Sequence, residues 1–149
     1  MVWLLIVLQF FLALGALGGG GALLAAPDGS WLKMPMSMLK YSPFPDFLIP
    51  AAILFIFLGI YPVAVAYSLW KRPNWRWPDF LNPFKGMHWS WAGSLAAGMM
   101  LIIWITVEVL MLRSIAFLHV LYFGLGVAIV VMTLVPKVRR HFAATGIKT

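Results

Sequence analysis

The sequence predicts an all-α fold, a polytopic transmembrane four-helix bundle, and three observations support this prediction. The chain of 149 residues is 63% hydrophobic and only 10% charged, whereas an ordinary soluble domain has about 25% charged residues. Four apolar stretches of the sequence each reach the roughly 20 residues that a helix needs to cross a bilayer. The basic residues lie at the ends of these stretches, at the level of the headgroups. We therefore expect a single transmembrane domain over residues 1–149.

The first expected span covers residues 2–26. It lacks the basic residues that precede the apolar part of a secretory signal, so we expect a retained anchor. The Pro-Asp-Gly-Ser sequence at 27–30 is typical of a turn. Residues 31–41 mix Trp, Leu and Met with two lysines, which indicates a short interfacial segment in this loop.

The second expected span covers residues 47–70, with Asp46 as its N-cap. Pro62 lies inside this span and should bend it. A tryptophan-rich connector at 74–88 is typical of a membrane interface. The third and fourth spans cover residues 89–112 and 115–135, and the short link between them predicts an antiparallel helical hairpin.

Counts of lysine and arginine predict the orientation of the spans. The loop after the second span and the C-terminal tail have four each, the loop after the first span has two, and the third turn has only Arg113. Under the positive-inside rule, both termini then lie in the cytoplasm and residues 27–46 lie on the outer face of the cell inner membrane.

Small residues should mark the contacts between helices, because membrane helices associate by close backbone approach. We expect such contacts at Gly15, Gly19, Gly93, Ala97, Gly124 and Ala128. In the third span, small and hydroxyl residues recur at spacings of three, four and seven on the same face as Glu108, which predicts that this face turns into the bundle. Its members are Ser90, Ser94, Ala97, Leu101, Trp104 and Glu108.

Glu108 is the only carboxylate inside the apolar spans. A carboxylate at membrane depth is costly, so it must face protein or water and find a partner. We favour a structural ion pair with a nearby base, either Arg113 or a lysine of the outer loop, Lys33 or Lys40. The alternative is an outward pocket that binds a proton, a cation or another ligand. Candidate binding residues for such a pocket are Glu108, Arg113, His119, Asp46 and Trp104.

Catalytic and metal-binding patterns are missing from the sequence. There is no cysteine, no Gly-x-Ser-x-Gly motif and no pair of histidines at a metal-binding spacing. His88 and His119 are either ligands of a metal or pigment or ordinary interfacial histidines, and we favour the second reading. The net charge of +7 belongs to the ends of the spans and does not indicate a nucleic-acid surface. We expect no enzyme and no metal site, and the cofactor stays open.

Several motifs resemble those of a known family. They are Asp28-Gly29-Ser30, the run Pro43-Phe44-Pro45-Asp46-Phe47-Leu48-Ile49-Pro50, Trp104-Ile105-x-Val107-Glu108 and Leu121-Tyr122-Phe123-Gly124-x-Gly126. The combination is similar to small bacterial four-helix integral membrane proteins without a settled activity, which are loosely DoxX-like in layout. The resemblance implies the fold and leaves the function open.

Two functions follow as expectations. The first is a non-enzymatic accessory or structural subunit of a larger membrane complex, such as an energy-transducing one, that contacts partner helices, lipids or pigments. The alternative is a small binding or transport protein for a lipid, quinone or polar solute at Glu108. In either case the chain contacts membrane lipids, and a homo-oligomer is compatible with both.

Overall fold

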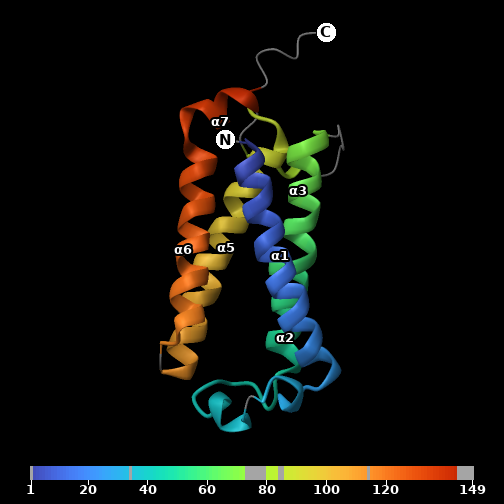
Figure 1. Cartoon of the computed structure of the whole chain (residues 1–149), viewed down its shortest axis with the longest axis vertical. Helices are drawn as coiled ribbons and strands as arrows, with labels where there is room; N and C mark the ends of the chain where they lie inside the picture. Colours follow the sequence, from blue (N-terminus) through green and yellow to red (C-terminus); the bar gives the residue numbers. More distant parts are fainter. Residues whose placement is uncertain (1, 34, 73–79, 84–85, 114, 144–149) are drawn as a thin grey trace.

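Four long helices lie side by side in the computed structural model, which describes residues 2–33, 35–72, 80–83, 86–113 and 115–143 (Figure 1). Each is long and apolar enough to cross a membrane, which confirms the prediction of a multi-pass helical membrane protein. The spans are α1 (Val2–Ala25), the composite α2–η3–α3 (Leu48–Lys71), α5 (Trp89–Leu112) and α6 (Phe117–Leu134).

Both ends of the described chain lie at one end of the bundle, here called the terminal end (Figure 1). The short helix α7 (Pro136–His141) crosses this end. Phe142, directly after α7, is 1% exposed, and its carbonyl accepts the backbone N–H of His88 at 2.8 Å. The opposite end, called the loop end, holds residues 27–46 and the α5–α6 turn. The tryptophans expected in the connector, Trp75 and Trp77, lie outside the described residues.

The second span contains a π-helical turn, η3 (Ile56–Ile60), between α2 (Leu48–Phe55) and α3 (Tyr61–Lys71). We expected Pro62 to bend this span. Pro62 has no backbone N–H to donate, and its ring crowds the preceding turn. The wider π turn before it accommodates both effects. The helix therefore continues through the proline instead of breaking.

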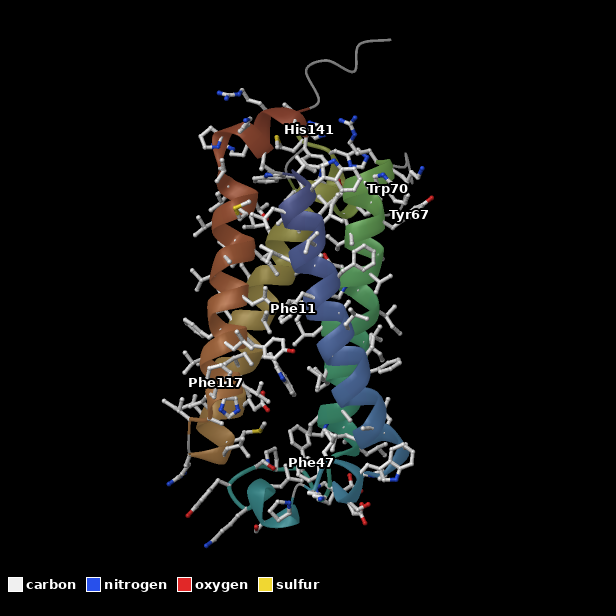
Figure 2. All side chains as sticks on the ribbon, in the orientation of Figure 1. Phe11, Phe47, Tyr67, Trp70, Phe117 and His141 are labelled. Atoms are coloured by element: carbon white, nitrogen blue, oxygen red, sulfur yellow. The ribbon has the colours of Figure 1, made fainter. Side chains whose placement is uncertain are left out.

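The loop end is held by short polar caps and a small apolar cluster. Oδ1 of Asp46 accepts the backbone N–H of Leu48 at 3.0 Å. The helix itself begins at Leu48, with Phe47 at the N-cap position. We expected Asp46 at the N-cap, but it lies one residue before it. Two 3₁₀ helices, η1 (Ser30–Leu32) and η2 (Met36–Leu39), form the segment expected at the interface. Phe47, labelled in Figure 2, packs with Leu23, Leu39 and Ala51.

The helix contacts only partly follow the expected small residues. Gly93 contacts Tyr61, whose hydroxyl donates to the Gly93 carbonyl at 2.9 Å. Ala97 is fully buried and Ala128 is half-buried. A side chain added at Gly15 would strike the Tyr122 hydroxyl of α6.

Two of these expectations were wrong. A Cβ added at Gly19 or Gly124 would meet no atom within 4 Å. The α5–α6 pair diverges from α1 and α2 toward the loop end (Figure 1), so α1 leaves α6 after the Gly15 contact. A close approach of two glycines joins Gly98 of α5 to Gly126 of α6, where an added Cβ at Gly98 would lie 3.1 Å from the Gly126 carbonyl oxygen.

Candidate functional site

Glu108 and His119 face each other across the α5–α6 interface near the loop end. Oε1 of Glu108 lies 3.7 Å from Nε2 of His119. Glu108 is one turn from the end of α5 and His119 is in the first turn of α6, so the short link brings them to the same level. Both ionisable groups therefore lie within the membrane-spanning helices and share one site.

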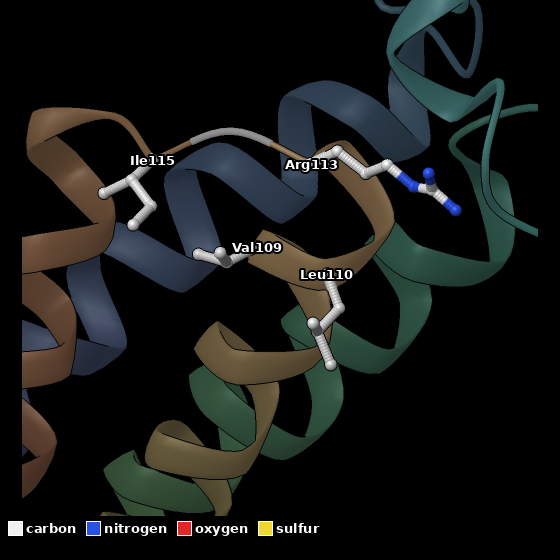
Figure 3. Close-up of a pocket in the computed structure, with 4 residues that line it drawn as sticks. All are labelled: Val109, Leu110, Arg113 and Ile115. Atoms are coloured by element: carbon white, nitrogen blue, oxygen red, sulfur yellow. The ribbon is translucent and has the colours of Figure 1, made fainter.

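The partner that we favoured for Glu108 was wrong. Arg113 takes the left-handed conformation that ends α5, with φ of 53°. Its guanidinium lies over the ring of Tyr41, 4.2 Å from the ring centre, and points toward the loop of residues 27–46 (Figure 3). The backbone at the end of α5 thus turns Arg113 away, and the close polar contact found for Glu108 among the described residues involves His119.

The hydrogen bonds of His119 define which ring nitrogen carries the proton. The backbone N–H of Ala116 donates to Nδ1 at 2.9 Å, so Nδ1 is an acceptor and Nε2 carries the proton. His119 is therefore the neutral tautomer that presents its N–H to Glu108. The bond to Ala116 is the reach-back half of a capping box at the start of α6. The methyl group of Ala116 offers no acceptor for the reciprocal half.

Glu108 remains accessible although it lies on the inward face of α5. Its side chain is 29% exposed, against 11% for His119. The Trp104 side chain lies near the carboxylate, one helical turn earlier on the same face. Two turns deeper on the same face, Leu101 is only 1% exposed. The carboxylate is thus partly exposed, whereas the same face of α5 is closed two turns deeper.

The apolar core of the bundle lies below Glu108, on the side toward the terminal end. Each helix contributes at least one side chain that is 1% exposed or less: Leu12, Leu58, Leu101 and Ile129. Aromatic rings flank the open part above this core. The ring centres of Phe11 and Tyr122 lie 6.2 Å apart with an angle of 29° between the ring planes, and Trp104 and Tyr122 are half-buried. The site therefore combines one carboxylate and one neutral imidazole, with half-buried aromatic rings one turn away at Trp104 on α5 and Tyr122 on α6.

An apolar groove of about 310 Å³ runs between α5 and α6 on the outer surface of the bundle. His119 lines its inner wall, together with Ile105, Thr106, Leu110, Ile115, Val120 and Phe123. A wider depression of about 830 Å³ extends the groove to Arg113 through the shared residues Val109, Leu110 and Ile115 (Figure 3).

A second polar cluster, toward the terminal end, was missed from the sequence. Nε2 of Gln9 donates to Oγ of Ser94 at 3.0 Å, and Ser94 bonds Oγ1 of Thr133 at 2.9 Å. All three residues are fully buried, and Oε1 of Gln9 has no partner among the described residues. Gln9 is the single polar residue of α1, and this was the signal in the sequence that an inward polar contact existed.

The remaining candidates do not join the Glu108 site. The carboxylate of Asp46 is engaged with the start of α2. Nδ1 of His88 bonds Oγ of Ser90 at 2.8 Å and caps the start of α5, at the terminal end. His88 and His119 therefore lie at opposite ends of the bundle. Within the described ranges, no three residues of the His, Cys, Asp and Glu types are grouped as metal ligands.

Comparisons with models of known protein families, with curated proteins and with solved structures give no match to this chain. The resemblance to small DoxX-like membrane proteins therefore stays an expectation that rests on the sequence motifs.

Proposed function

We propose that the protein binds a small cationic solute, of the organic ammonium type, at Glu108 near the loop end of the bundle. The observation that supports this proposal is the accessibility of Glu108: a carboxylate on an inward helix face is 29% exposed above a core that is closed at Leu101. Ionisable residues retained within membrane spans commonly serve ligand or ion sites.

The chemistry around Glu108 favours a cation over an anion. A carboxylate supplies charge and hydrogen-bond acceptors, and the faces of Trp104 and Tyr122 attract an ammonium group through their π electrons. His119 is neutral, so it does not repel a cation. Both of its ring nitrogens are engaged, one with Ala116 and one with Glu108, and it therefore acts by orienting the carboxylate.

The closed core favours binding over open passage. Leu12, Leu101 and Ile129 separate Glu108 from the polar cluster at the terminal end. A solute held at Glu108 could cross the membrane only if the α5–α6 pair moved against α1 and α3. The basic residues favour a cytoplasmic terminal end, so the site would receive its solute from outside.

The binding test compares Glu108→Gln with Thr106→Val in purified protein. Thr106 is an exposed residue of the same helix whose hydroxyl bonds only its own helix, the Ile102 carbonyl at 2.8 Å. Tetramethylammonium or Na⁺ should raise the melting temperature of the wild type and of Thr106→Val. At a cation concentration of 100 times Kd, binding would stabilise the folded protein by about 2.7 kcal/mol. The Glu108→Gln variant should not respond.

Two results would contradict the solute site. One is a wild type that neither cation stabilises at concentrations that leave the micelle unchanged. The other is an equal response of the wild type and Glu108→Gln, which would mean that the cation acts elsewhere. Acetate salts of the same ionic strength with a bulky inert cation serve as the control for salt effects.

The accessory-subunit function remains a second proposal, supported by the large free surface of the spans. Only 22–33% of the most apolar window of each span is buried within the protein, so most of every helix is left for lipid or partner helices. Purification from native membranes in a mild detergent tests it. Stoichiometric larger subunits would support this function, and a lone monomer or homodimer would contradict it.

A further inference from the structure

We propose that the α5–α6 groove binds one anionic lipid, with its headgroup at Arg113 and Lys40 and one acyl chain along the groove. This site is separate from the proposed solute site. Thr106 and Leu110 line the groove, and each is two residues from Glu108, about 200° around a helix of 3.6 residues per turn. The two sites therefore lie on different sides of α5 and share only His119.

The groove offers contact surface but no spare hydrogen-bond donor. Nδ1 of His119 is occupied by Ala116, and Nε2 faces Glu108. The Thr106 hydroxyl donates to the Ile102 carbonyl at 2.8 Å. The other lining residues are hydrocarbon or aromatic, such as Ile105, Leu110, Val120 and Phe123. A polar head inside the groove would go unpaired, whereas a hydrocarbon chain would not.

The location of the groove also favours a lipid chain. It opens on the outer surface of two spans, beside residues that are largely exposed: Leu110 at 69%, Ile115 at 71% and Val120 at 62%. In a bilayer this surface faces acyl chains. Its volume of about 310 Å³ is at the lower end of small-molecule sites, about 300–1,000 Å³, and suits part of one chain.

A pair of cations lies at the headgroup end of the groove. The Arg113 guanidinium lies 4.2 Å from the centre of the Tyr41 ring, and the Lys40 ammonium lies 5.5 Å from the same centre. No carboxylate of the described residues lies within 4.0 Å of either cation. Both cations lie beside one ring, and a phosphate that reached either of them would form charge-assisted hydrogen bonds. A guanidinium that contacts a ring can still donate its in-plane N–H groups.

The depression at Arg113 and the apolar groove are continuous, so together they match the shape of one lipid. The depression at Arg113 and the apolar groove share Val109, Leu110 and Ile115. Arg113 ends α5, so it lies where a span meets the headgroups. A lipid with its phosphate at Arg113 would therefore have its chain directed down the groove toward Phe123.

The test is lipid retention, measured by native mass spectrometry. Protein in detergent receives equal amounts of phosphatidylglycerol and phosphatidylcholine with identical acyl chains. The wild type should retain phosphatidylglycerol preferentially. Arg113→Gln should lower the ratio about fivefold, which corresponds to about 1 kcal/mol per basic residue, and Lys40→Gln should lower it as well. Lys33→Gln removes an exposed charge from the same loop and should leave the ratio unchanged.

A second pair of variants tests the acyl chain. Val120→Trp fills the groove and should reduce retention of both lipids, whereas Val131→Trp, at a similarly exposed position outside the groove (56% against 62%), should not. Equal retention of the two lipids by the wild type would overturn the proposal. So would an equal loss in Lys33→Gln and Arg113→Gln, which would indicate general surface charge, or full retention in Val120→Trp.

Discussion

Adding one methyl group at Gly98 should loosen the helix pair that holds Glu108 against His119. An ideal Cβ at Gly98 would lie 2.8 Å and 3.0 Å from methyl groups of Val130 and Ile129. It would also lie 3.1 Å from the Gly126 carbonyl oxygen. The two side chains can rotate, but the backbone carbonyl can move only if α6 moves as a whole. We therefore expect α5 and α6 to separate slightly in Gly98→Ala.

The size of the effect follows from two opposing contributions. Overpacking a close contact costs about 1–3 kcal/mol, whereas replacing glycine by alanine within a helix gains about 1 kcal/mol. Gly98→Ala should therefore lower the free energy of unfolding by about 0–2 kcal/mol. Gly124→Ala is the matched control in α6, because its Cβ would meet nothing within 4 Å. That variant should be neutral or more stable by up to about 1 kcal/mol.

The assay is unfolding by sodium dodecyl sulfate in mixed micelles, followed by tryptophan fluorescence. Because both variants share the gain from replacing glycine, their free energies of unfolding should differ by the overpacking cost of about 1–3 kcal/mol, with Gly98→Ala the less stable. A Gly98→Ala variant that is as stable as Gly124→Ala would refute the close packing of α5 against α6.

Three further results are expected. Ser94→Ala removes both hydrogen bonds at the centre of the buried polar cluster and should cost about 1–2 kcal/mol in the same unfolding assay; an unchanged midpoint would show that the cluster is not formed. Since the chain has no native cysteine, Ser37→Cys should react with an impermeant maleimide on intact cells and Lys137→Cys only after lysis, while the reverse pattern would invert the orientation. The Ser30 backbone N–H donates to Asp28 and lowers the pKa of that carboxyl. Its contribution to loop stability should be present at neutral pH and be lost only as pH falls through the lowered pKa; a carboxyl shift in NMR that titrates at or above the ordinary value would contradict this.

The four spans could be predicted because each is a continuous apolar stretch of the necessary length. The contacts between them could not be predicted as well. Small residues occur on every face of these helices, and the spacing alone did not show that Gly98 and Gly126 meet while Gly19 and Gly124 do not. The inward face of α5 was predictable because its polar and small members recur with the helical period.

The partner of Glu108 was predicted wrongly because the charge of Arg113 was considered without the backbone geometry at the end of α5. Arg113 was favoured as the nearest permanent cation, yet the end of α5 turns it toward Tyr41. The sequence did contain the correct signal. Glu108 lies five residues before position 113 and His119 lies five residues after position 114, and residues equally distant from the turn of an antiparallel hairpin lie at one level. The His119 tautomer depends on the fold of residues 115–119 and could not be read from the sequence.

The most direct test concerns access to Glu108 from the loop end. Glu108→Cys and Leu101→Cys each introduce a single thiol on the same face of α5, at positions that are partly exposed and 1% exposed. A membrane-impermeant, cationic methanethiosulfonate is added to intact cells, and modification is measured by mass. We expect rapid modification of Glu108→Cys and none of Leu101→Cys. Equal protection of both thiols would show that no site for a cationic solute opens at Glu108.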